Sequence, residues 1–143
     1  MARYVTTISS RLSPAEAFAY MADFRNVTEW DPSIERIDLL SGDAGALGSR
    51  YGVKMKSTSL EYETTTVTPG TTVVLRGENS WVVSIDEITV AAGDGGLADV
   101  TYDAKLSLKG PLGLAGPLLS LVFGRLGGKA RDGLVARIGR PAS

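Results

Sequence analysis

The chain has 143 residues, of which 43% are hydrophobic, and a formal net charge of −1 at pH 7. This length is typical of one domain that buries a substantial core, and we expect a single domain over residues 1–143. The near-neutral charge gives no general attraction to polyanions, so we expect no nucleic-acid partner. The chain has neither cysteine nor histidine, which excludes disulfides, thiolate nucleophiles and the commonest metal ligands. We therefore expect no metal and no cofactor.

The first thirty residues predict a strand followed by short helices. Residues 5–11 are strand-like, and Ser13 and Pro14 then form a helix start, because Ser13 can accept hydrogen bonds from free amides and proline suits the first helical position. We expect a helix over 15–22. The segment Trp30-Asp31-Pro32 ends any further helix, since proline disfavours helical backbone in the residue before it.

After Pro32 the pattern changes to the alternation that is typical of strands. We expect six strands over 34–40, 47–56, 60–67, 72–77, 81–92 and 98–109. Short turns join them, which predicts an antiparallel sheet with one buried face. The alternation places six side chains on one inner face: Tyr51, Val53, Tyr62, Leu75, Tyr102 and Ala104.

The strand over 81–92 does not keep one register. Val83 and Ile85 favour odd positions inward, whereas Val90 favours even positions. A bulge near Asp86 would reconcile them, because one extra residue reverses the facing. If Asp86 faces inward, burial raises its pKa and makes it a candidate proton donor or acceptor. The sequence favours the outward orientation, in which Asp86 pairs with a basic neighbour.

Beyond residue 111 the chain returns to helical spacing. One apolar stripe comprises Leu119, Val122, Phe123, Leu126, Ala130, Leu134 and Ile138. Gly127 and Gly128 interrupt this stripe at a cost of roughly 1 kcal/mol each relative to alanine. Two explanations are open, close packing of the sheet against the helix backbone, or a hinge that opens a cavity. We favour the hinge.

This order of elements resembles the helix-grip fold of the START-like (SRPBCC) superfamily over essentially the whole chain. Trp30-Asp31-Pro32, the Gly-x-Arg-aromatic segment 48–51, Pro69, Gly95-Gly96 and Gly110-Pro111 are similar to the superfamily's pattern. The superfamily includes polyketide cyclases and dehydrases, lipid-transfer START domains and pollen-allergen proteins. The resemblance implies an α+β fold, in which a curved seven-stranded antiparallel sheet wraps a long C-terminal helix and two short helices follow strand 1.

The resemblance also implies an apolar cavity between the sheet and the last helix. The function we expect is binding or transport of a hydrophobic small molecule there, such as a lipid, a polyketide or another ring compound. The alternative is a polyketide cyclase/dehydrase-type enzyme that uses Tyr, Asp or Arg side chains. A third alternative is a structural protein whose aromatic residues fill the core. Our candidate pocket residues are Trp30, Tyr51, Val53, Tyr62, Leu75, Trp81, Asp86, Tyr102, Ala104, Leu119 and Phe123.

Two sets of charged residues also need an interpretation. The acidic residues Asp23, Glu29 and Asp31 make a poor metal site without histidine, and we interpret them as helix-end charges. The last helix carries Arg125, Lys129, Arg131, Arg137 and Arg140, which form either a solvated face or a transient contact with anionic lipid headgroups. No signal peptide is visible, and the apolar stretch 112–124 is too short for a bilayer span. We expect a cytoplasmic monomer or homodimer.

Overall fold

The computed structural model describes residues 2–56, 58–110 and 116–140, and only the backbone of residues 116–121. Seven strands form one antiparallel sheet in the order β1-β7-β6-β5-β4-β3-β2. Their bounds are β1 Ala2–Ser9, β2 Ile34–Ser41, β3 Arg50–Met55, β4 Ser59–Thr68, β5 Thr72–Glu78, β6 Val82–Ala92 and β7 Ala98–Leu108. The helical segments are α1 Pro14–Ala22, η1 Phe24–Glu29, η2 Asp94–Gly96 and α2 Gly116–Ile138. The predicted α+β arrangement is confirmed.

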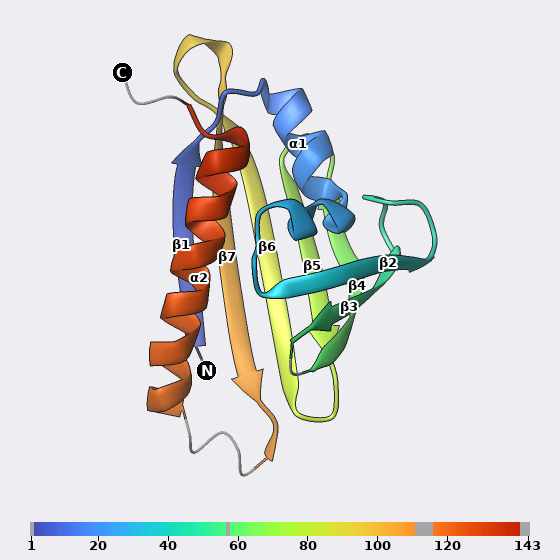
Figure 1. Ribbon diagram of the computed structural model, residues 1–143. Coiled ribbons are helices and arrows are strands. Elements are labelled where there is room, and N and C mark those ends of the chain that lie inside the picture. Colours follow the sequence, from blue (N-terminus) through green and yellow to red (C-terminus); the bar gives the residue numbers. More distant parts are fainter. Residues whose placement is uncertain (1, 57, 111–115, 141–143) are drawn as a thin grey trace.

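The helices α1, η1 and α2 cover the same face of the sheet (Figure 1). The last helix, α2, lies along β1, while α1 lies over β6 and β7 and η1 contacts β2. The first and last strands of the sequence, β1 and β7, are hydrogen-bonded neighbours in the sheet. In the strand order, α2 and α1 thus lie over neighbouring strands at one side of the sheet, and η1 lies against β2 at the other side. No helix in the described part of the chain is long and apolar enough to cross a membrane.

The predicted start of α1 is confirmed. Ser13 Oγ accepts a hydrogen bond from Glu16 N at 3.2 Å, and Glu16 Oε1 accepts one from Ser13 N at 3.0 Å. Pro14 occupies the first helical position, where no amide donor is needed. This capping box fixes the direction in which α1 leaves β1, and so places its buried residues Ala17 and Met21 on the sheet.

The predicted bulge near Asp86 is wrong. Strand β6 pairs with β5 and with β7 in one continuous register, so Ser84 and Asp86 both face inward. Val83 is half-buried and Ile85 is exposed on the outer face, where strand-forming residues are tolerated without burial. A register shift occurs instead in β4, next to Thr65. The expected outward orientation of Asp86 is therefore also wrong.

The apolar stripe of α2 is covered over only half of its length. Ala130, Leu134 and Ile138 are buried against the sheet, whereas Val122 is 47% exposed and Leu126 is 38% exposed. The prediction that this stripe packs as one face is thus correct for the C-terminal half and wrong for Val122. The N-terminal half of the stripe is therefore only partly covered by the sheet.

Glycines set the distance between α2 and its neighbours. A Cβ atom at Gly127 would clash with the Tyr4 ring of β1, and one at Gly133 would clash with the Trp30 carbonyl oxygen. A Cβ at Gly128 would meet no atom within 4 Å among the described residues. Close packing therefore explains Gly127, in place of the hinge that the sequence favours.

Candidate functional site

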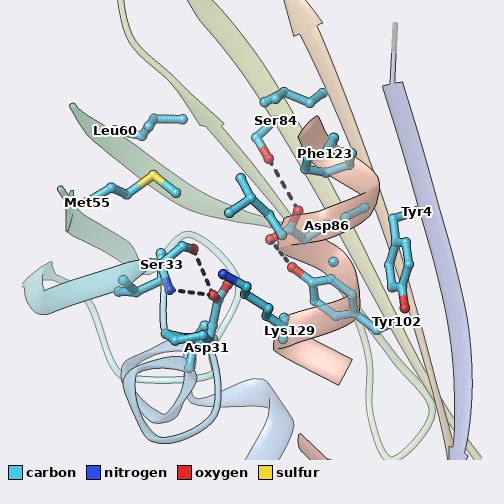
Figure 2. Close-up of a pocket in the computed structure, with 18 of the residues that line it drawn as sticks. Tyr4, Asp31, Ser33, Met55, Leu60, Ser84, Asp86, Tyr102, Phe123 and Lys129 are labelled. Atoms are coloured by element: carbon cyan, nitrogen blue, oxygen red, sulfur yellow. Dashed lines mark hydrogen bonds between the residues drawn. The ribbon is translucent and has the colours of Figure 1, made fainter. Parts of the chain in front are cut away.

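A cavity of about 420 Å³ lies between α2 and the inner face of the sheet. Its volume lies within the usual range for small-molecule sites. Apolar side chains from several strands and from α2 supply most of its wall (Figure 2), including Met55, Leu60, Val82, Leu106, Phe123 and Leu126. Residues Phe24 and Val27 of η1 close it on the side of the short helices. The α2 residues that line the cavity are Phe123, Leu126, Gly127, Lys129 and Ala130.

Asp86 supplies a buried polar group on this apolar wall. Its side chain is in the middle of β6, and the residue is only 3% exposed. The Tyr102 hydroxyl donates a hydrogen bond to Asp86 Oδ2 at 2.9 Å, and the Ser84 hydroxyl donates one to Asp86 Oδ1 at 3.3 Å (Figure 2). Burial raises the pKa of Asp86 to about 7, although both hydroxyl donors oppose this shift. The carboxyl group can therefore gain or lose a proton near neutral pH.

Asp31 is a second carboxylate in the cavity wall. It follows η1, and its Oδ1 accepts hydrogen bonds from Ser33 N at 2.9 Å and from Ser33 Oγ at 2.7 Å. This local turn holds the side chain in one orientation. Burial raises the pKa of Asp31, and the charge of Asp31 in turn helps to raise the pKa of Asp86. The two carboxyl groups are thus electrostatically coupled.

Tyr62 is positioned by a missing side chain on the neighbouring strand. It pairs with Gly77 of β5, and a Cβ atom at that glycine would lie 2.6 Å from the Tyr62 ring. The ring therefore lies flat across Gly77, with Phe24 at a centroid distance of 4.8 Å. Burial raises the pKa of Tyr62, which keeps its phenol protonated. Gly77 thus allows a large aromatic group to form part of the cavity wall.

The structure brings together five of the predicted pocket residues. Tyr62, Asp86, Tyr102, Ala104 and Phe123 all line the cavity. These five residues belong to β4, β6, β7 and α2, and the fold brings these elements together. Leu119 lies among the α2 residues whose side chains are outside the described part of the chain.

Four other candidates lie in the core and outside the described cavity lining. Tyr51, Val53 and Leu75 are at most 1% exposed. The Tyr51 hydroxyl accepts hydrogen bonds from Gly45 N at 2.9 Å and from Ser49 Oγ at 3.2 Å. Trp30 is 4% exposed and packs edge-on against Tyr102, with a centroid distance of 5.5 Å and an interplanar angle of 85°. These four residues are therefore packed in the core of the described part of the chain and do not line the cavity.

Trp81, another predicted pocket residue, lies outside the described cavity lining. It lies in the turn between β5 and β6 and is 62% exposed. Its backbone amide donates to Asn79 Oδ1 at 2.8 Å within the turn, and Trp81 is not among the residues that line the cavity. A tryptophan beside a strand is a weak pocket signal, since turn geometry decides which way it points.

Sequence reasoning missed Asp31, Ser33, Met55 and Tyr4 as lining residues. For Asp31 a signal existed, because Asp-Pro-Ser is a pattern that favours a side chain bonded to the backbone two residues on. That pattern was interpreted only as a helix end. Lys56 and Lys129 also line the cavity, and both are exposed. Among the described residues, no group of three acidic side chains is arranged as a metal site.

The outer charges are mostly satisfied within the protein. Arg50 pairs with Glu61 and Glu63 on the outer face of the sheet, as its alternation predicts. On α2, Arg131 Nε donates to Thr6 Oγ1 at 3.0 Å and Arg137 Nη2 donates to Glu29 Oε2 at 3.1 Å. Much of the basic face of α2 is therefore engaged with neighbouring elements.

Comparisons with known proteins agree with this architecture. A START superfamily protein from Mycobacterium smegmatis superposes with a TM-score of 0.73, at 15% identity, over 96% of this chain and 97% of its own. A protein from Helicobacter pylori gives a TM-score of 0.74 at 13% identity, covering 95% and 86% of the two chains. Ara h 8.0201 gives 0.56 at 15% identity, covering 92% and 97%. These similarities confirm the helix-grip fold of the START-like superfamily.

Sequence comparison supports the same assignment at the level of the family. A search of curated proteins finds no match. The family model described as polyketide cyclase / dehydrase and lipid transport matches residues 1–139. Because that match covers nearly the whole chain, this protein belongs to the polyketide cyclase / dehydrase and lipid transport family.

Proposed function

We propose that this protein binds a hydrophobic small molecule, such as a lipid, a polyketide or another ring compound, in the cavity between the sheet and α2. The single observation that carries the proposal is the cavity itself, with a volume of about 420 Å³ and a wall of mainly apolar side chains. An apolar ligand gains free energy by leaving water, and it needs few polar contacts to be held. The family match supports the same class of ligand.

A neutral apolar dye, Nile red, tests this proposal by its fluorescence in the presence of the protein. We expect saturable binding to one site per chain. Ala104→Leu adds a side chain inside the cavity, and should weaken the affinity by about tenfold because it removes volume from the site. Ala104 is well suited because it is buried, lines the cavity and lies in the middle of β7.

Lys105→Leu provides the matched control. Lys105 follows Ala104 in β7 and therefore faces the outer side of the sheet, so the same side chain introduced there leaves the cavity unchanged. Equal loss of dye binding in both variants, or no binding by the wild-type protein, would contradict the proposal.

A second candidate function is a cyclase/dehydrase-type reaction, and the Asp86 site favours it. This reaction class removes a proton from the carbon beside a carbonyl group and later returns a proton to oxygen. Asp86 has a pKa raised to about 7 and is hydrogen-bonded to Tyr102 inside an apolar cavity. A carboxyl group in this state is suited to general acid–base chemistry near neutral pH.

Hydrogen–deuterium exchange at the α carbon of a long-chain methyl ketone, followed by NMR, tests this second function. An enzyme of this class should exchange the α protons faster than buffer does, and Asp86→Asn should abolish the excess rate. The rate should rise as pH passes about 7, because only the ionised carboxylate accepts a proton. Exchange at the buffer rate would exclude Asp86 as a base and leave binding as the function.

The location and assembly of the protein are further parts of the proposal. We propose a cytoplasmic monomer or homodimer that makes at most transient membrane contact. With Arg131 and Arg137 engaged by β1 and η1, Arg125 and Lys129 are the exposed charges on which lipid contact would depend. Sedimentation with anionic vesicles, compared between wild type and an Arg125→Ala, Lys129→Ala double variant, tests this contact.

A further inference from the structure

The two carboxylates of the cavity lack the basic partner that most other acidic side chains of the described residues have. In the described part of the chain, Asp31 and Asp86 form no ion pair within 4 Å, whereas Asp23, Asp103 and Glu78 each pair with a basic residue. Asp86 is satisfied by neutral hydroxyl groups only. Oδ2 of Asp31 receives no hydrogen bond from the described residues, since both bonds from Ser33 go to Oδ1.

Both groups face the same enclosed space. Figure 2 shows Asp31 on the loop after η1 and Asp86 on β6 around the same space, with Met55 and Leu60 on one side and Tyr102 on the other. In this view the Lys129 nitrogen lies beside the Asp31 oxygens. Their coupling is also visible in the pKa of Asp86, which the charge of Asp31 helps to raise. Two like charges in an apolar cavity repel each other and repel any anion that enters.

The nearby cations do not neutralise this pair. Lys56 and Lys129 line the cavity but are exposed, and neither comes within 4 Å of Asp31 or Asp86 in an ion pair. Figure 2 shows Lys129 reaching from α2 over the same space. Its ammonium group therefore weakens the negative potential of the two carboxylates without removing it. A water-exposed charge acts through a high dielectric constant.

We propose that the cavity selects amphipathic molecules that carry a positively charged amine, whose ammonium group faces Asp31 and Asp86 while its apolar body lies along Met55, Leu60 and Phe123. This inference rests on the proposed function, and it names the class of ligand within it. An ammonium donor supplies the charge partner that the protein does not, and hydrogen bonds to carboxylates are among the strongest available. A ligand carboxylate would add a third negative charge.

The affinity for an amine should depend on pH with a definite sign. The groups facing Asp86 are Asp31 from the loop after η1, Tyr62 from β4, Tyr102 from β7 and Lys129 from α2. The tyrosines stay protonated, since burial raises the pKa of both. Asp86 loses its proton as pH rises through about 7. Amine affinity should therefore increase between pH 5.5 and pH 8, over which an alkylammonium group remains charged.

Calorimetric titration with decylamine, decanol and decanoate, all below their micelle concentrations, tests the inference on the full chain. At pH 8 we expect decylamine to bind about tenfold more tightly than decanol, and decanoate about tenfold more weakly than decanol. At pH 5.5 the preference for decylamine over decanol should fall by about threefold or more. Decanol serves as the neutral reference, because it has the same chain and no charge.

Variants identify the groups responsible. Asp86→Asn should lower the decylamine to decanol ratio several-fold while decanol still binds, with the remaining preference due to Asp31. Asp103→Asn, on the outer face of β7, should leave the ratio unchanged. Lys129→Met should keep or raise the ratio, because it removes a competing cation.

The outcomes separate the two proposals. If decanol binds and decylamine binds no more tightly at pH 8, the amine inference is wrong and the hydrophobic cavity stands. If decanoate binds most tightly and Lys129→Met abolishes its binding, the site is anionic-ligand specific and the inference is also wrong. If none of the three binds, the proposed function itself fails. Because the wild-type protein alone gives the ratio, a variant that does not fold leaves the test intact.

Discussion

Asp86 combines deep burial with the absence of a basic partner, and this should appear in the pH dependence of stability. Burial raises its pKa to about 7 in the folded protein, whereas an unfolded chain gives an aspartate about 3.9. Between these values the folded protein holds a proton that the unfolded chain has lost. The free energy of unfolding therefore falls as pH rises through this window, by roughly 2–4 kcal/mol.

Asp86→Asn removes this dependence, because asparagine does not titrate. Relative to wild type, the variant should gain stability steadily from pH 4 to pH 8 in urea unfolding experiments. Asp103→Asn is the control with the opposite sign. Arg3 lowers the pKa of Asp103 through an ion pair of 2.7 Å, so its contribution is present at neutral pH and is lost in acid. Parallel stability curves for wild type and Asp86→Asn would show that Asp86 is not buried.

Truncation of the two tryptophans should change the free energy of unfolding to very different extents. Trp30 is 4% exposed and packs edge-on against Tyr102, so Trp30→Ala should reduce the free energy of unfolding by about 3–5 kcal/mol. Trp81 is 62% exposed, and Trp81→Ala should change it by no more than about 0.5 kcal/mol. Thermal and urea unfolding measure both. Similar losses in the two variants would mean that Trp81 is buried by a contact that the structure lacks.

At the scale of elements, the glycines of α2 rank by the space around them. Gly128 has open space, Gly127 lies against the Tyr4 ring, and Gly133 lies against the backbone carbonyl of Trp30. Gly128→Ala should stabilise the protein by up to about 1 kcal/mol through helix propensity. Gly127→Ala should destabilise it by about 1–3 kcal/mol through overpacking. Gly133→Ala should cost more than Gly127→Ala, because a backbone carbonyl cannot rotate away.

A second substitution distinguishes packing from a hinge at Gly127. If the tyrosine ring is the obstacle, Gly127→Ala should cost much less stability when it is introduced into a Tyr4→Ala variant than when it is introduced into the wild-type protein. The Gly128→Ala variant controls for a general effect of alanine on α2. If Gly127→Ala raised stability and slowed Nile red binding, the hinge hypothesis would return.

The elements differ in how well the sequence specifies them. The start of α1 was predictable because Ser13, Pro14 and Glu16 act locally. Strand β7 was predictable because its alternation is regular from Val100 to Leu108. Strand β6 was also predicted, over 81–92, but its facing was not, since Val83 and Ile85 are apolar residues on an outer face while Ser84 and Asp86 are polar residues on the inner face. That inversion marks the place where the inner face lines a cavity.

At the scale of the whole molecule, the fold was more predictable than the site. The order of elements and the motifs around Trp30 and Gly48–Tyr51 indicated the START-like superfamily. Which inner residues line free space depends on how η1, the loop after it and α2 meet the sheet, and these contacts join residues distant in sequence, such as Gly133 and Trp30. Tyr51 and Tyr62 have the same pattern in their strands, yet only Tyr62 lines the cavity.

The measurement that tests the account most directly is an NMR titration of the methyl-labelled protein with decanol. The account predicts saturable shift changes at the methyl groups of Met55, Ala104 and Ala130, which line the cavity. It predicts no change at Val5 and Ile85, whose side chains are exposed on the outer face. Shift changes confined to the outer face, or none at any of these methyl groups, would contradict the claim that this cavity binds a hydrophobic small molecule.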